Sequence, residues 1–152
     1  MVGGMGLMKN WWVGFEVCEA PESQLSERTI SRVKWILQVS LGLLLIGHGG
    51  FGAFVHQEYL ITHWRAIGIP ATHTFIAAVG WFEILLGVIV AARPMIPVVW
   101  FILAWKIATE LLYPIAGDPV DIFETIERWG DYGGCVALLL ILYYYRNRSR
   151  GA

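Results

Sequence analysis

Long apolar runs alternate with shorter polar connections along the chain. The runs extend from about Trp35 to Val55, Thr72 to Ala92, Met95 to Pro114 and Gly130 to Tyr145. Each is close to the roughly 20 residues that a helix needs to cross a bilayer, although the fourth is a little short. The pattern predicts an all-α fold, an integral membrane four-helix bundle.

Two long connections, roughly 56–71 and 115–129, lie on one side of these runs. Each contains a segment that mixes apolar and acidic residues with a tryptophan, Trp64 in the first and Trp129 in the second. Amphipathic segments of this kind lie in the interface between lipid and water. We therefore expect one short interfacial helix in each of the two outer loops.

The N-terminal arm is too polar to span a membrane but carries several aromatic side chains. These side chains could dip into the headgroup region or fold onto a neighbouring subunit. The candidate partner contacts are the aromatic residues of the arm and the tryptophans of the outer loops: Trp11, Trp12, Phe15, Trp64 and Trp129.

Basic residues gather on the side of the membrane where both termini lie. The opposite loops contain Arg65 and Arg128, whereas the side of the termini holds Lys9, Arg28, Arg32, Lys34, Arg93, Arg146, Arg148 and Arg150. Because cytoplasmic loops are enriched in Lys and Arg, both termini are expected in the cytoplasm. The chain then divides into an N-terminal interfacial or cytoplasmic arm (1–33), a four-helix membrane domain (34–147) and a basic tail (148–152).

Composition agrees with a membrane location and excludes one class of partner. Hydrophobic residues make up 57% of the chain and charged residues 15%, with a formal net charge of −1. This balance is typical of membrane proteins, whose first partner is the lipid bilayer. No basic stripe interleaved with aromatic residues occurs, so a nucleic-acid partner is not expected.

A small set of ionisable residues interrupts the apolar runs: His48, Glu83, Lys106 and Glu110. An ionised side chain at the bilayer centre costs about 2.5–3.5 kcal/mol, so these groups must face protein or water. Glu83 lies about 11 residues before Pro94 and Lys106 about 12 after it, which places them at one depth on adjacent helices. We therefore expect a Glu83–Lys106 ion pair, on a face of the second run where Gly80 and Gly87 let another helix come close.

The remaining members of the set extend this group toward the outer side. Lys106 and Glu110 are four residues apart, and Tyr113 continues the same helical stripe. By depth, His48 is expected near Glu110. Two interpretations remain open: a buried network that fixes helix register, or a pocket that binds a polar headgroup or relays protons.

His48 lies between glycines that could admit a flat macrocycle. Haem iron or chlorophyll magnesium at His48 is the weaker alternative to a hydrogen-bonded core histidine, since no second histidine lies at its depth. The outer histidines, His56, His63 and His73, lack tight ligand spacing, so no metal site is predicted. The chain is expected to carry no cofactor of its own.

Two motifs, Gly47-His48-Gly49 late in the first run and Gly80-x-x-Glu83-x-x-x-Gly87 in the second, resemble the DoxX-like family of small bacterial membrane proteins. The resemblance covers roughly 30–146 and implies a four-helix bundle in the bacterial inner membrane. Some members of that family are subunits of a thiosulfate:quinone oxidoreductase or partner with redox enzymes. The resemblance implies that His48 and Glu83 face a quinone or handle protons. The N-terminal arm and the Lys106/Glu110 pair are not part of the family pattern.

Two functions follow as hypotheses, neither of them a stand-alone enzyme with catalytic residues. The first is a subunit of a membrane redox system that contacts quinone through candidate ligand-binding residues His48, Glu83, Lys106, Glu110 and Tyr113. The alternative is a non-catalytic accessory subunit of a larger respiratory or photosynthetic complex. Such a subunit would contact neighbouring subunits, pigments or lipids.

Overall fold

Helices account for nearly all of the structure, a computed structural model that describes residues 26–116, 123 and 126–151. No strand occurs among these residues, so the all-α prediction is confirmed. The elements are α1 (Glu27–Gly50), the π-helix η2 (Phe51–Val55), α2 (Gln57–Ala66), α3 (His73–Ala92), α4 (Ile96–Glu110), α5 (Leu112–Ala116) and α7 (Trp129–Gly151).

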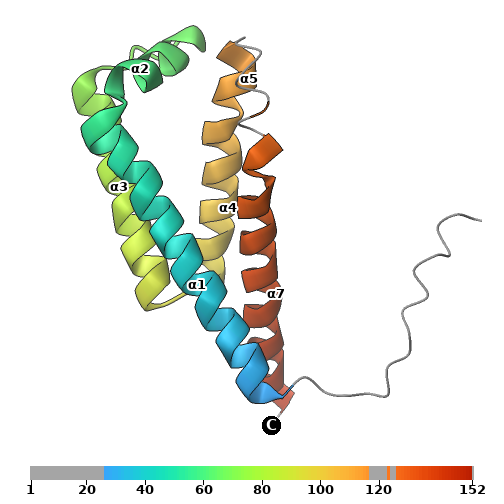
Figure 1. The fold of residues 1–152 in the computed structure, drawn as a ribbon. Helices are drawn as coiled ribbons and strands as arrows, with labels where there is room; N and C mark the ends of the chain where they lie inside the picture. Colours follow the sequence, from blue (N-terminus) through green and yellow to red (C-terminus); the bar gives the residue numbers. More distant parts are fainter. Residues whose placement is uncertain (1–25, 117–122, 124–125, 152) are drawn as a thin grey trace, which may run out of the picture.

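The long helices run roughly parallel to one axis of the molecule (Figure 1). α1 packs along α3 over most of its length and against α7 near its own start, while α4 packs against α7. α2 lies across the far end of α1 and α3, where it also contacts α5. The first predicted interfacial helix therefore exists, whereas most of the second, together with Trp11, Trp12 and Phe15, lies outside the described residues.

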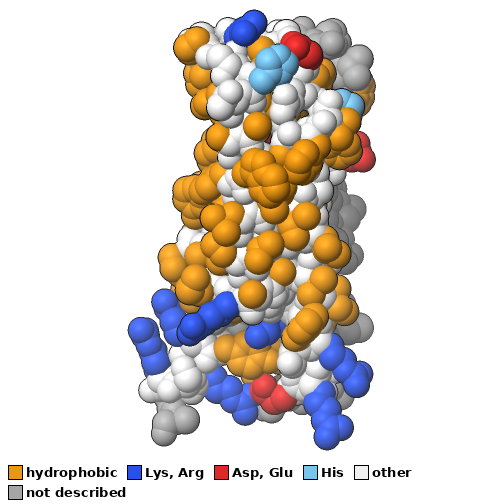
Figure 2. Space-filling model, turned by 90° about the vertical axis from the view of Figure 1, so that its left-hand side faces the viewer, with side chains coloured by type: hydrophobic (Ala, Val, Ile, Leu, Met, Phe, Trp, Pro, Cys, Tyr) orange, Lys and Arg blue, Asp and Glu red, His pale blue; other side chains and the backbone are white. Residues whose placement is uncertain are grey.

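Within the described residues, three helical stretches are long and apolar enough to cross a membrane: Glu27–Val55, His73–Ala92 and Ile96–Ala116. The fourth expected span corresponds to α7, which has 23 residues but is not among these candidates. Its apolar middle is flanked by Asp131 near one end and by arginines near the other, which lowers its mean hydropathy. Figure 2 shows the apolar belt between the two polar ends of the molecule.

Local sequence signals set the helix boundaries. The Ser26 hydroxyl accepts a hydrogen bond from the Thr29 amide at the start of α1, and the Thr72 hydroxyl accepts one from the Phe75 amide at the start of α3. Such N-caps satisfy amides that have no partner within the helix. Between α3 and α4 the chain turns within Arg93–Met95, as the short connection predicted, and Pro97 sits in the first turn of α4.

Glycines hold α1 and α3 at close backbone distance. A Cβ atom on Gly80 would lie 2.5 Å from the Gly49 carbonyl oxygen and equally close to the Ala53 amide nitrogen. One on Gly87 would lie 2.7 Å from the Gly42 carbonyl oxygen. The predicted small-residue face of the second run is thus confirmed, and α1 is the helix that packs on it.

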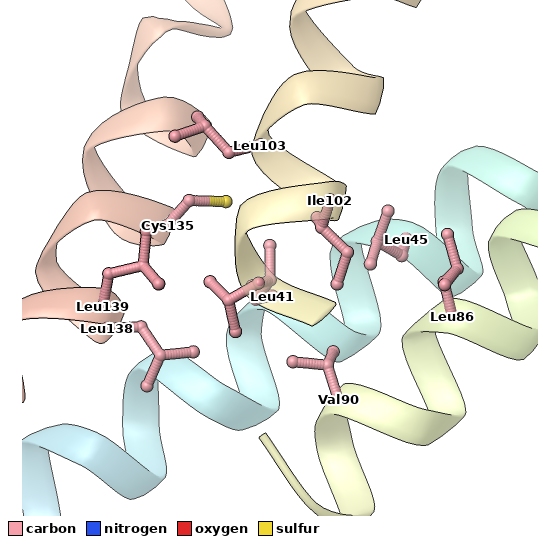
Figure 3. Packing of buried hydrophobic residues seen from close by; sticks show 10 residues of the cluster. Leu41, Leu45, Leu86, Val90, Ile102, Leu103, Cys135, Leu138 and Leu139 are labelled. Carbon is pink, nitrogen blue, oxygen red and sulfur yellow. The ribbon is translucent and has the colours of Figure 1, made fainter. Parts of the chain in front are cut away.

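Apolar side chains from α1, α3, α4 and α7 meet in one buried cluster (Figure 3). Its buried members are Leu41, Leu45, Leu86, Val90, Val99, Ile102, Leu103, Cys135, Leu138 and Leu139. None of these side chains carries a charge, so the cluster itself is held by packing. Next to it, Gln38 of α1 is 5% exposed and donates a hydrogen bond of 2.6 Å to the Ala91 carbonyl oxygen of α3.

We expect Gly80→Ala to lower the free energy of unfolding by about 1–3 kcal/mol, because the added methyl group overlaps the α1 backbone. Unfolding in mixed micelles measures the change. Gly47→Ala is the matched control, since a Cβ there meets no other described atom within 4 Å. An equal loss of stability in both variants would contradict the close α1–α3 contact.

Candidate functional site

Lys106 and Glu110 form an ion pair where the end of α4 packs against the start of α7. The distance from Lys106 Nζ to Glu110 Oε1 is 2.5 Å, and both residues are 0% exposed. The second carboxylate oxygen of Glu110 accepts a hydrogen bond from the Tyr132 hydroxyl of α7. The amine and the carboxylate are therefore buried as a pair, and the hydrogen bond from Tyr132 joins this pair to α7.

Glu83 has different partners. It is 5% exposed, and its Oε1 accepts a hydrogen bond of 2.9 Å from Trp105 Nε1. Its Oε2 lies 3.8 Å from Nδ1 of His48, whose side chain is 26% exposed. At that distance the two groups form an ion pair when the imidazole is protonated, and a water molecule can bridge them when it is neutral.

The prediction of a Glu83–Lys106 ion pair is wrong, because each of the two residues has another partner. Counting residues from Pro94 fixes the depth of a side chain, but not the direction in which the helix turns it. Successive residues differ by about 100° around a helix, so at nearly the same depth Trp105 faces Glu83 while Lys106 is turned into the α4–α7 contact. His48, expected near Glu110, instead pairs with Glu83.

A cavity of about 40 Å³ lies beside the His48–Glu83 pair. Besides these two residues, its polar lining comes from His63 on α2, Thr109 on α4 and Tyr113 on α5. Most of the lining is apolar, but the polar groups named above could hold one to a few water molecules in a cavity of this size. The predicted ligand-binding residues thus divide into two groups: His48, Glu83 and Tyr113 line the cavity, whereas Lys106 and Glu110 form a separate buried pair.

α2 covers the cavity from the outer end of the molecule. Leu60, His63 and Trp64 of this helix line it, and Trp64 also packs edge-on against Phe75 with ring centroids 5.3 Å apart. Trp64, expected to contact a partner, therefore faces the inside of the structure. Trp129 is 68% exposed and remains open to contact from outside.

An aromatic group forms the outer wall of the cavity. The His63 ring lies 4.2 Å from the Tyr59 ring and 5.1 Å from the Tyr113 ring, centroid to centroid. His63 Nδ1 donates to the Tyr59 carbonyl oxygen at 2.8 Å, because a carbonyl can only accept. Arg128 also lies over the Tyr113 ring, with its guanidinium carbon 4.7 Å from the ring centroid.

Sequence reasoning missed Trp105, His63 and Thr109. Trp105 is adjacent to Lys106, and its indole N–H is a donor that needs a buried acceptor, which is the signal that could have found it. His63 and Leu60 share one face of α2 at a spacing of three residues, the spacing of a helix side that packs inward.

The fold and these contacts define a class of protein: a helical, membrane-embedded chain that contacts lipid and holds charged side chains between its helices. The sequence matches no protein-family model, no curated protein and no solved structure. The DoxX-like resemblance therefore stays a prediction. Across the part of the chain that the structure describes, no three His, Cys, Asp or Glu side chains are grouped so as to hold a metal ion.

Removing one partner of the Lys106–Glu110 pair should be far more harmful than removing both. We expect Lys106→Met and Glu110→Gln each to lower the free energy of unfolding by about 3–5 kcal/mol, because each disrupts the pair on which the burial of its partner depends. The double variant Lys106→Met/Glu110→Gln should lose much less stability than the sum of the two single losses. A double-mutant cycle measured by unfolding in mixed micelles gives this coupling.

Glu27→Gln provides the control for the cycle, since Glu27 pairs with Arg148 on the exposed surface. Its effect should stay within about 1 kcal/mol. Additive losses at Lys106 and Glu110 would show that the two side chains do not compensate each other.

Proposed function

We propose that the chain is a DoxX-like four-helix membrane protein of the bacterial inner membrane, and that it serves a redox system as a small quinone-contacting subunit. The chain itself supplies proton-exchanging groups, and another protein of the system supplies the redox centre. The observation that carries the proposal is the His48–Glu83 pair beside a water-sized cavity.

The pair has the chemistry that quinone reduction or quinol oxidation requires, since each of these reactions moves two protons. Imidazole and carboxylate groups are the side chains that most often pass protons to and from a bound partner. Trp105 fixes the carboxylate through one oxygen, which leaves the other oxygen facing His48. Proton exchange between the pair and water in the cavity then needs no movement of the helices.

The size of the cavity limits what the pair can contact directly. Sites that enclose small molecules measure roughly 300–1,000 Å³, far more than the 40 Å³ beside His48 and Glu83. A quinone ring therefore lies outside this cavity, at the surface of the subunit, while water in the cavity links the ring to the pair. A haem or chlorophyll macrocycle on His48 is too large for the same space.

Two features support the proposed topology. The apolar middle of α7, followed by Tyr143, Tyr144 and Tyr145 and then by arginines, fits a fourth span that ends in an aromatic belt. The start of α1, the α3–α4 turn and the end of α7 lie at one end of the molecule (Figure 1). Most of the Lys and Arg residues gather at this end, which favours a cytoplasmic location for both termini.

Glu83→Gln and His48→Ala should each weaken binding of a short-chain quinone to the purified chain by about tenfold. Each change removes one hydrogen bond between a charged side chain and the water that links it to the quinone headgroup. Such a bond contributes about 1.5–3 kcal/mol to the binding free energy. Titration of the chain in lipid nanodiscs with a water-soluble quinone measures the affinity.

Glu27→Gln is the matched control for this experiment, because it removes a carboxylate at the opposite end of the molecule. It should leave quinone affinity unchanged. If Glu83→Gln and His48→Ala bind quinone as tightly as the unaltered chain while keeping its stability, the proposed function is wrong.

The exposed aromatic face of α3 and α4 favours a second candidate function, that of an accessory subunit in a larger complex. Phe82, Phe101 and Trp105 stack in one group, with centroid distances of 5.3–6.2 Å, and Trp81 and Trp100 are exposed on the same two helices. Aromatic residues are enriched where subunits meet.

For the accessory role, extraction in mild detergent should recover the chain together with other subunits or with pigment absorbance. A double substitution in the aromatic group, Phe82→Leu/Phe101→Leu, should release the chain from these partners. Migration of the unaltered chain alone in a native gel would contradict this second candidate.

A further inference from the structure

A groove lies between the start of α1 and the end of α7, at the basic end of the molecule. It has a volume of about 500 Å³, and Glu27, Arg28, Ser31, Arg32 and Tyr145 line it. Figure 2 shows basic side chains around this end, just beyond the apolar belt. The groove is at the opposite end of the structure from the His48–Glu83 cavity and shares no residue with it.

The acid in the groove does not neutralise the two arginines. The Glu27 carboxylate pairs with Arg148 and accepts a hydrogen bond of 3.1 Å from the Tyr144 hydroxyl. Arg148 in turn donates to the Tyr144 hydroxyl at 3.0 Å. These contacts join α1 to α7 and leave the positive charge of Arg28 and Arg32 uncompensated within the described part of the chain.

Arg28 and Arg32 are four residues apart, so their side chains project from the same face of α1. Both are exposed, and the Ser31 and Tyr145 hydroxyls add neutral donors beside them. A guanidinium group binds a phosphate through two parallel hydrogen bonds, which makes arginine the preferred residue for this anion. The groove therefore offers two phosphate-binding forks and two hydroxyl groups.

The neighbouring surface is suited to acyl chains. The apolar belt begins on α1 just after Val33. Here Trp35 is 61% exposed and Ile36 is 65% exposed. Lys34 lies 5.9 Å from the centroid of the Tyr145 ring, and basic and aromatic residues are typical of the level of lipid headgroups. A molecule that carries a phosphodiester and two acyl chains would contact the groove and the belt at once.

We propose that this groove is a binding site for an anionic phospholipid, with the phosphodiester held by Arg28 and Arg32 and the acyl chains lying along Trp35 and Ile36. The inference does not depend on the quinone proposal, because the two sites lie at opposite ends of the bundle. Basic residues near a membrane surface strengthen the binding of anionic lipids about fivefold each.

The test is native mass spectrometry of the full chain released from micelles that contain phosphatidylglycerol and phosphatidylcholine. We expect the chain to retain phosphatidylglycerol in preference, and Arg28→Gln/Arg32→Gln to lower that retention about tenfold or more. Arg146→Gln/Arg150→Gln is the matched control, since it removes the same charge from the same end but outside the groove. It should change retention by about twofold at most.

Two further measurements distinguish a phospholipid site from general attraction to positive charge and from a site for free phosphate. Arg28→Lys/Arg32→Lys keeps the charge but loses the paired hydrogen bonds, and it should retain less lipid than the unaltered chain. Excess soluble glycerol phosphate should not displace the lipid, because it lacks the acyl chains. Equal losses in the groove and control variants, or displacement by glycerol phosphate, would overturn a phospholipid site in this groove.

Discussion

Compensation of buried charge is the constraint on which this structure depends. Apolar helices exclude water, so burying an ionised side chain between them without a partner costs several kcal/mol of folding free energy. Lys106 meets this requirement with Glu110, one turn along its own helix, and Glu83 meets it with Trp105 and His48. Each solution also links helices, since Tyr132 connects α7 to α4 and the contacts of Glu83 connect α3 to α4 and α1.

The two charge clusters lie in different surroundings, and the proposed function rests on only one of them. Lys106 and Glu110 are completely buried in the α4–α7 contact, so their protons exchange with water only if the helices part. Glu83 and His48 border a cavity beneath α2. The glycine contacts between α1 and α3 fix the spacing of these two side chains, which makes the backbone packing part of the site.

The sequence predicted the helices well because hydrophobic runs and turn residues act locally. The three spans, the turn at Pro94, the small-residue face around Gly80 and the interfacial helix α2 all follow from such signals. The expected fourth span, α7, is not among the candidate spans, because Asp131 and the terminal arginines shorten its apolar part. Side-chain partners could not be predicted, because the depth of a residue along a helix does not give the direction in which its side chain points. At Glu83 the partner on α4 is therefore Trp105 and not Lys106. The residues on the inner face of α2 could not be predicted for a similar reason, because packing decides which side of that helix faces the bundle.

The assignment of partners to the buried charges can be measured directly by dipolar recoupling in solid-state NMR. The sample is the chain in lipid bilayers with ¹⁵N in the His and Lys side chains and ¹³C in the Glu carboxyl groups, assigned with single-site variants. The account predicts a contact between the His48 imidazole nitrogen and the Glu83 carboxyl carbon, and a contact between Lys106 Nζ and the Glu110 carboxyl carbon. A contact from Lys106 Nζ to Glu83, with none from His48, would contradict it.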